Sequence, residues 1–279
     1  MTTPFAEWVG RGEIQRDTVD PTRVAQALAL LDLPRAKAVP GAPLPPLFHL
    51  FFANEVVPQG ELAGDGHARL GRFMPPIDGH GAVKRRMWAA GDIRFEGTIK
   101  VGENLERRSV ITAIESKAGR SGPSLFVVGE RTLSSPSGRV VEERTVVYRT
   151  LPDAPAAESV DLAPDTALSP RDTWLPDERA LFRFSALTWN SHRIHYDRAF
   201  CQVEERYPDL LVHGPFTALK LALLAAQGKA GIRRFAFRGL QALYVNRPVT
   251  LVADEAATQL QALNHRGQLA MAARVEYLT

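Results

Sequence analysis

The sequence predicts an α+β fold made of two related halves, and three observations support this. Each half has one helical segment early, followed by a run of segments rich in β-branched residues. Residues 151–172 are rich in Pro, Ala and Asp without sustained periodicity, which is typical of an interdomain linker. The chain has 279 residues, of which 45% are hydrophobic and 23% charged, and this suffices for two ordinary domains. We therefore expect domains over residues 1–150 and 173–279.

The first half begins with a helix over residues 21–31. Asp20 can accept hydrogen bonds from the free N–H groups of the first turn, and Pro21 suits the first helical position. After a Pro-rich connector, residues 47–56 are apolar with helical spacing, which predicts a buried helix.

An antiparallel meander is predicted between residues 87 and 149. Its β-branched segments are separated by turns rich in Gly, Pro and Ser. The expected strands cover residues 109–114, 124–133 and 140–148.

The second half continues with a predicted strand over residues 180–187. Asp197 is placed to cap a short helix, and Pro215 opens a longer helix that Gly228 ends. The remaining strand candidates are residues 234–245, 249–253 and 269–277.

Composition excludes several classes of protein. The net charge of +3 is spread out, with no block of five like charges, so we expect no nucleic-acid partner. A mild positive field suits an anionic substrate such as a coenzyme A ester. The single cysteine, Cys201, rules out an internal disulfide framework and reads as a buried structural thiol. No leader-like start and no apolar run near the roughly 18 residues of a membrane span are present, so we expect a cytoplasmic protein without membrane contact.

Acid–base chemistry is indicated in the polar turn that contains Asn190 and His195. An imidazole titrates near neutrality, so His195 can take a proton from water and return one to carbon. The Asn190 amide can hold a water but cannot act as a base, and an Asx-turn or a helix cap is its alternative reading. His192 either contacts substrate or lies behind the site. Because no third metal ligand stands near the His195–Asp197 pair in sequence, we expect no metal.

His213-Gly214-Pro215 predicts a helix start that can bind an oxyanion. Glycine permits close backbone approach, and the free N–H groups at the helix start face the ligand. A plain tight turn is the alternative. His213 and Thr217 are candidates for substrate contact, with Thr217 bonding either the backbone or a pantetheine arm.

Arg85, Arg86 and Trp88 are the candidate substrate-binding residues of the first half. Basic residues beside an aromatic ring can bind a phosphate or a carboxylate and stack on adenine. A solvated basic turn next to a core tryptophan fits the same residues.

These segments carry a resemblance to a known family. Residues 190–197 (NSHRIHYD) and 212–218 (VHGPFTA) resemble the hydratase motif of MaoC-like hot-dog proteins, and more narrowly that of type 2 hydroxyacyl-thioester dehydratases. Five segments of the first half agree: GDGH at 64–67, GRFMPP at 71–76, RRMWAAG at 85–91, KAGRSG at 117–122 and VVYR at 146–149.

The resemblance implies a double hot-dog fold, in which two antiparallel sheets each wrap a central helix. It implies that only the second domain is catalytic and that the first shapes the acyl pocket. His195 would be the acid/base residue and the Gly214 N–H the oxyanion donor, with no cofactor beyond the CoA of the substrate. Many relatives have Asp at the position of Asn190, so here His195 would perform both proton transfers.

Within this branch the chain most resembles hydratases of itaconyl-CoA and mesaconyl-C4-CoA. This implies hydration to citramalyl-CoA in itaconate degradation, with Arg85 or Arg86 binding the distal carboxylate. Two alternatives stay open: a 3-hydroxyacyl dehydratase acting on acyl carrier protein or CoA esters, and a non-catalytic protein that binds acyl-CoA. Two hot dogs in one chain already form a pseudo-dimer, which is consistent with a monomer, and a homodimer is the other possibility, because exposed sheet edges often pair.

Overall fold

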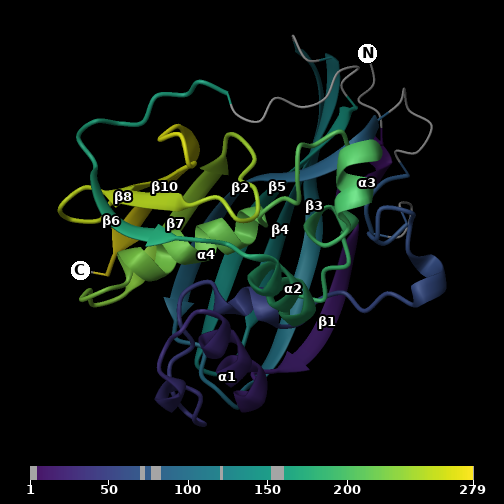
Figure 1. Cartoon of the computed structure of the whole chain (residues 1–279). Helices are drawn as coiled ribbons and strands as arrows, with labels where there is room; N and C mark the ends of the chain where they lie inside the picture. Colours follow the sequence, from purple (N-terminus) through teal and green to yellow (C-terminus); the bar gives the residue numbers. More distant parts are fainter. Residues whose placement is uncertain (1–4, 70–72, 77–82, 120–121, 152–159, 279) are drawn as a thin grey trace.

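The computed structural model describes residues 5–69, 73–76, 83–119, 122–151 and 160–278. One antiparallel sheet runs through this part of the chain, with helices on one of its faces (Figure 1). Its strands are β1 (Gly12–Thr18), β2 (Val83–Gly97), β3 (Asn104–Gly119), β4 (Gly122–Ser134), β5 (Gly138–Thr150), β6 (Ser169–Trp174), β7 (Ile232–Gly239), β8 (Val249–Ala253), β9 (Gln259–Leu263) and β10 (Leu269–Tyr277). The α-helices are α1 (Pro21–Leu30), α2 (Glu178–Leu187), α3 (Arg198–Val203) and α4 (Gly214–Ala225).

The strand order confirms the two related halves. It runs β1-β3-β4-β5-β2-β7-β10-β9-β8-β6, so from the centre outward each half presents its second, fifth, fourth, third and first strand. The halves join where β2 pairs with β7, from Ala90 opposite Arg238 to Arg94 opposite Arg234. This is the double hot-dog arrangement, with both sheets fused into one.

Helix α4 is the central helix of the second half. Apart from Lys220 it is mostly apolar and buries residues such as Phe216, Leu219 and Leu221, as expected of a helix enclosed in a core. It packs on β7, β9 and β10 of its own half and on β2 of the other half (Figure 1).

The predicted buried helix over residues 47–56 was wrong in type. Only the 3₁₀ turn Phe48–Phe51 forms, although its residues are buried as predicted. Leu47 and Ala53 have left-handed φ angles of 62° and 50°, which interrupt a helix at both ends.

The predicted strand over residues 180–187 was also wrong, because this segment is helix α2. Asp177 accepts a hydrogen bond from the Ala180 N–H at 2.8 Å and so caps the helix. Leu181, Phe184 and Ser185 then lie on one buried face, at helical spacing. The analogous prediction for α1 is confirmed, since Asp20 accepts from the Arg23 N–H at 2.8 Å.

Four strands were missed or misplaced, and one of them is β2, because no strand was expected before residue 109. The last residues of the predicted linker belong to β6, which pairs with β8. The edge strand β1 and the five-residue β9 lack β-branched runs, so no local signal marked them. The longer strands β3, β4 and β5 contain the predicted meander. Parts of two resemblance segments, residues 71–72 and 120–121, lie outside the described residues, as do residues 152–159 of the linker.

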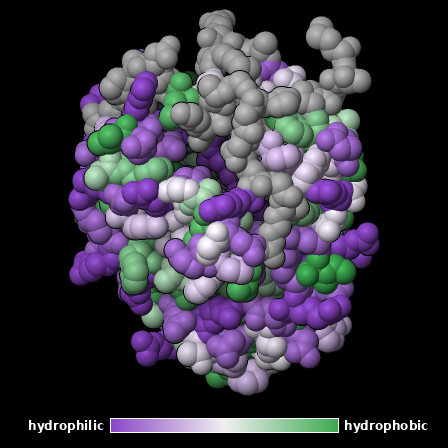
Figure 2. All heavy atoms as spheres, turned by 90° about the vertical axis from the view of Figure 1, so that its right-hand side faces the viewer, coloured by the Kyte–Doolittle hydropathy of each residue, from purple (hydrophilic) through white to green (hydrophobic). Residues whose placement is uncertain are grey.

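One face of the molecule is mainly polar (Figure 2). Figure 2 shows hydrophilic side chains over most of one face, with hydrophobic ones scattered among them. None of the described helices is long and apolar enough to cross a membrane.

Candidate active site

A single cavity of about 660 Å³ lies between the two halves and brings the predicted site residues together. Residues from both halves line it. They include all nine candidates from the sequence: Arg85, Arg86, Trp88, Asn190, His192, His195, His213, Gly214 and Thr217.

His195 is oriented as a base. It lies in the 3₁₀ turn Arg193–His195, and its Nδ1 is 2.8 Å from the Leu211 carbonyl oxygen. Because a carbonyl only accepts hydrogen bonds, Nδ1 carries the proton and Nε2 keeps its lone pair. Burial lowers the pKa of His195 to about 4, so the ring is neutral near pH 7. A neutral imidazole with a free lone pair can take a proton from water.

His213 holds His195 beside the start of α4. Their rings are stacked with centroids 3.5 Å apart, and the Ser185 hydroxyl is 2.8 Å from His213 Nε2. His213 is only 1% exposed, so it forms the wall behind His195 more than a substrate contact.

The start of α4 leaves one N–H group available. The N–H groups of Phe216 and Thr217 both donate to the His213 carbonyl, at 3.0 and 3.1 Å, and Pro215 has none. The Gly214 N–H has no acceptor within the described part of the chain, and Gly214 lines the cavity. A thioester carbonyl oxygen bound there would be polarised by this donor and by the helix dipole.

Asn190 has a defined orientation. Its side-chain oxygen accepts a hydrogen bond from the His192 N–H at 3.0 Å, which is the Asx-turn weighed as the alternative reading. The amide nitrogen is then the group that remains for a ligand, and it can only donate. Asn190 therefore fits a role in holding water, not in removing its proton.

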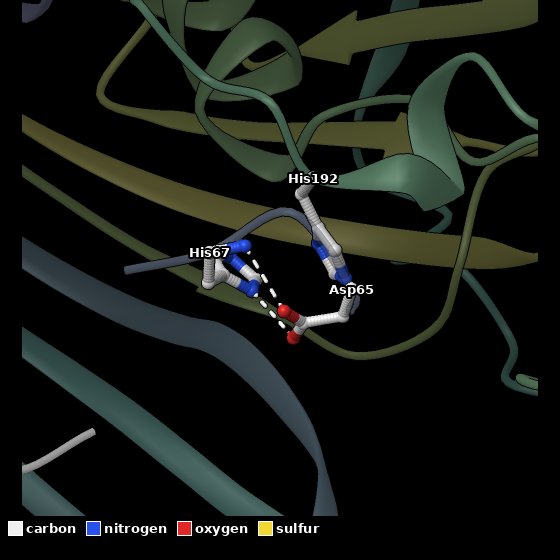
Figure 3. Close-up of side chains that lie close together, drawn as sticks. All are labelled: Asp65, His67 and His192. Carbon is white, nitrogen blue, oxygen red and sulfur yellow. Dashed lines mark hydrogen bonds and ion pairs between the residues drawn. The ribbon is translucent and has the colours of Figure 1, made fainter. Parts of the chain in front are cut away.

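A loop of the first half adds two residues, Asp65 and His67, which were predicted only as part of a resemblance segment. Asp65 Oδ2 is 2.9 Å from His67 Nδ1, and the His67 ring centroid is 3.9 Å from that of His192 (Figure 3). No carboxylate was expected near the site, but the fold brings Asp65 there. The Asp-Gly-His sequence of this loop was the only signal for it.

Asp65, His67 and His192 each offer a ligand atom, all within 4.8 Å of one another, which is close enough to hold a cation. Two features disfavour a bound cation at this position. The carboxylate of Asp65 already interacts with His67. Burial lowers the pKa of His67 most, and the positive charge of Arg86 lowers it further. The absence of a metal stays a prediction.

The three candidates from β2 have different surroundings. Arg85 is paired with Glu205 at 3.1 Å and lies over the Tyr207 ring, so its charge is already balanced. Trp88 lies under the Arg144 guanidinium, 3.6 Å from Cζ to the ring centroid, and is not free to stack on adenine. Arg86 makes no hydrogen bond or ion pair with the described residues. These residues lie on a strand, so the solvated-turn alternative was wrong.

The hydroxyl of Thr217 is 3.4 Å from the His213 carbonyl, which favours the backbone role over contact with pantetheine. Cys201 is fully buried, as predicted, and burial raises the pKa of its thiol to about 12.

Buried histidines should make the fold sensitive to acid. Burial lowers the pKa of His49 and of His195 to about 4, from 6.5 in an unfolded chain. The unfolded state therefore binds more protons between pH 6.5 and 4, so stability is complete above this window and falls as the pH is lowered through it. Each histidine should lower the free energy of unfolding by roughly 2 kcal/mol between pH 7 and pH 5.

Urea unfolding at both pH values measures this effect. The variant His49→Phe should lose less stability over the interval, whereas His265→Ala, an exposed control, should behave as the wild type. A free energy of unfolding that is unchanged from pH 7 to pH 5 would contradict the prediction.

Comparison with known proteins supports the family resemblance described from the sequence. The family described as hydroxyacyl-thioester dehydratase type 2 matches residues 47–245. The chain is 40% identical to a mesaconyl-C(4)-CoA hydratase of Chloroflexus aurantiacus over 275 residues, covering 96% of each chain. It is 25% identical to a mitochondrial hydroxyacyl-thioester dehydratase type 2 of Schizosaccharomyces pombe, covering 76% of this chain and 78% of the relative.

Solved structures agree on the fold. A Mycobacterium tuberculosis protein described as having a double hotdog fold superposes with a TM-score of 0.61 at 14% identity, covering 97% of this chain and 96% of that one. Together with the matched region and the catalytic geometry, this establishes that the chain belongs to the hydroxyacyl-thioester dehydratase type 2 family of MaoC-like hydro-lyases.

Proposed function

We propose that the protein hydrates a C5-dicarboxylyl-CoA ester, either mesaconyl-C4-CoA or itaconyl-CoA, to citramalyl-CoA. The observation that carries the chemistry is the pairing of one base and one oxyanion donor on the same cavity wall. The His195 ring is stacked at 3.5 Å on His213, the residue just before Gly214.

The reaction follows from these two groups. The Gly214 N–H polarises the thioester carbonyl, and Nε2 of His195 removes a proton from a water held by the Asn190 amide. The water oxygen bonds to C3, the π electrons move onto the thioester oxygen, and the protonated His195 returns its proton to C2. Because one residue handles both protons, addition is syn.

Itaconyl-CoA requires one step more. Its double bond is not conjugated to the thioester, so a proton must first leave C2 and a proton must be added to the terminal CH2 carbon, which moves the double bond to C2–C3. His195 can perform this transfer from the same position. These substrates and this product would place the enzyme in itaconate degradation.

The cavity wall supports a short, charged acyl group over a long alkyl chain. Charged or polar side chains of the first half line it: His49, Arg107, Arg131, Glu142 and Arg144. A fatty-acyl dehydratase would need an apolar wall in their place, because burying an alkyl chain against charges loses their solvation without compensation.

Side-by-side hydration of mesaconyl-C4-CoA, itaconyl-CoA and crotonyl-CoA tests the proposal, with products identified by mass. We expect kcat/KM for a C5-dicarboxylyl ester to exceed that for crotonyl-CoA, and the rates to be equal with and without EDTA. Preference for crotonyl-CoA would favour the fatty-acyl dehydratase. Tight binding of CoA esters without turnover would favour the non-catalytic alternative.

A further inference from the structure

The inner face of the first sheet carries a cluster of charges that the mechanism does not use. It consists of Arg107, Arg131, Glu142 and Arg144, hereafter the arginine cluster. Arg131 on β4 lies opposite Glu142 on β5, and Arg144 follows Glu142 on the same face of β5. Arg107 is on β3, the neighbour of β4 on the other side. All four side chains line the catalytic cavity.

Charge within the arginine cluster is only partly balanced. Glu142 accepts three hydrogen bonds from Arg144, at 2.9 to 3.0 Å. Arg107 donates to Gln15 at 2.9 Å and lies 3.7 Å from Glu13. Arg131 makes no hydrogen bond or ion pair with any residue that the structure describes.

Neighbouring carboxylates act on Arg131 only through space, without a hydrogen bond or ion pair to it among the described residues. Nε2 of His49 lies 4.0 Å from Glu142, but His49 is neutral because burial lowers its pKa to about 4. Burial also lowers the pKa of Arg131, even though the carboxylates of Glu142, Glu13 and Glu55 act in the opposite direction. A half-buried guanidinium on the cavity wall without a described hydrogen-bonded partner is well suited to bind an anion.

The position of Trp88 shows how close the arginine cluster lies to Gly214. Its ring centroid is 3.6 Å from Cζ of Arg144. Its carbonyl oxygen is 3.8 Å from the position that a Cβ on Gly214 would occupy. Trp88 alone therefore spans the distance between the Gly214 N–H and the arginine cluster. An acyl group whose thioester binds at Gly214 and whose carboxylate binds at the cluster must be short.

We propose that Arg131, with Arg144 beside it, binds the second carboxylate of the acyl group. This inference rests on the proposed function and names the part of the site that selects a dicarboxylyl ester. A guanidinium offers a planar fork of N–H donors that matches a carboxylate. In mesaconyl-C4-CoA the second carboxylate is only three bonds from the thioester carbon, which suits the short gap.

Binding at this position also helps the reaction. In mesaconyl-C4-CoA the second carboxylate is attached to C3, the carbon that water attacks. An ion pair with Arg131 fixes this carbon against His195 and offsets the negative charge that would otherwise repel the incoming oxygen. From the sequence, this role was predicted for Arg85 or Arg86. Arg85 is held by Glu205, whereas Arg86 remains on the wall near His67 and serves as the competing candidate.

The test compares substrates in the variant Arg131→Met, which keeps side-chain length and removes the charge. We expect kcat/KM for the preferred dicarboxylyl ester to fall about 100-fold, which is the usual scale for a buried charge-assisted pair. The value of kcat/KM for crotonyl-CoA, which has no second carboxylate, should change by less than about 3-fold. Arg86→Met should lower the dicarboxylyl rate less. Arg108→Met, an exposed residue on β3, is the matched control and should resemble the wild type.

Binding without turnover provides a second readout. Methylsuccinyl-CoA and butyryl-CoA, which cannot be hydrated, should differ in affinity for the wild type and lose that difference in Arg131→Met; Arg131→Lys should restore part of it. Equal losses for both substrates, or selectivity that follows Arg86 instead, would overturn the proposal. A wild type that prefers crotonyl-CoA would contradict the proposed function itself, which separates the two failures.

Discussion

Replacing His195 with alanine should lower kcat/KM for hydration by roughly 10³-fold, because general acid–base catalysis contributes on this scale and no other group here has the same role. Nε2 of His195 carries the free lone pair beside the oxyanion donor, whereas the amide of Asn190 cannot act as a base. Steady-state kinetics on the best substrate from the comparison above measures the effect.

The variant His195→Gln separates proton transfer from packing. Glutamine can still donate a hydrogen bond to the Leu211 carbonyl, but it cannot accept a proton from water. We expect the same loss of activity with a melting temperature closer to that of the wild type than the alanine variant shows. Turnover within about 3-fold of the wild type in either folded variant would exclude His195 as the general base.

The second large effect is expected at the start of α4. Gly214→Pro removes the single free N–H of this turn and should lower kcat by about 10²- to 10³-fold, the usual cost of losing one oxyanion donor. The residue before it can accept this change. His213 has φ −62° and ψ 128°, an extended conformation that suits a residue before proline. The lost N–H also has no described acceptor.

Gly214→Ala is the matched variant, because it keeps the N–H. A Cβ at this position would have the Trp88 carbonyl oxygen at 3.8 Å as its nearest neighbour, which is ordinary contact, so the fold should not change. The alanine variant should therefore retain more activity than the proline variant. If both lose activity equally while their far-ultraviolet circular dichroism matches the wild type, Gly214 serves only to leave room for the substrate.

Local signals in the sequence predicted much of the second half of the site. Asp197 caps α3 by accepting a hydrogen bond from the Phe200 N–H at 3.0 Å, and α4 begins beside Pro215 as predicted. Caps and turns depend on residues within a few positions of each other, so the residue types alone reveal them. His195, Asn190 and the Gly214 N–H were predicted as site candidates for this reason. The choice between helix and strand at 180–187 failed, because its apolar spacing fits both until Asp177 is recognised as a cap.

The tertiary structure decided what the first half contributes. Asp65 and His67 reach His192 across more than 120 positions of sequence, and Arg85 pairs with Glu205 over a similar separation. Arg131 and Arg144 read as ordinary charges on strands, where half of all side chains face solvent. Only the pairing of β2 with β7 turns the inner face of the first sheet toward His195. The sequence by itself determined which chemical groups are present and how each local turn holds them. Which charges became buried beside the substrate depended on contacts between distant strands, for which no short segment carries a signal.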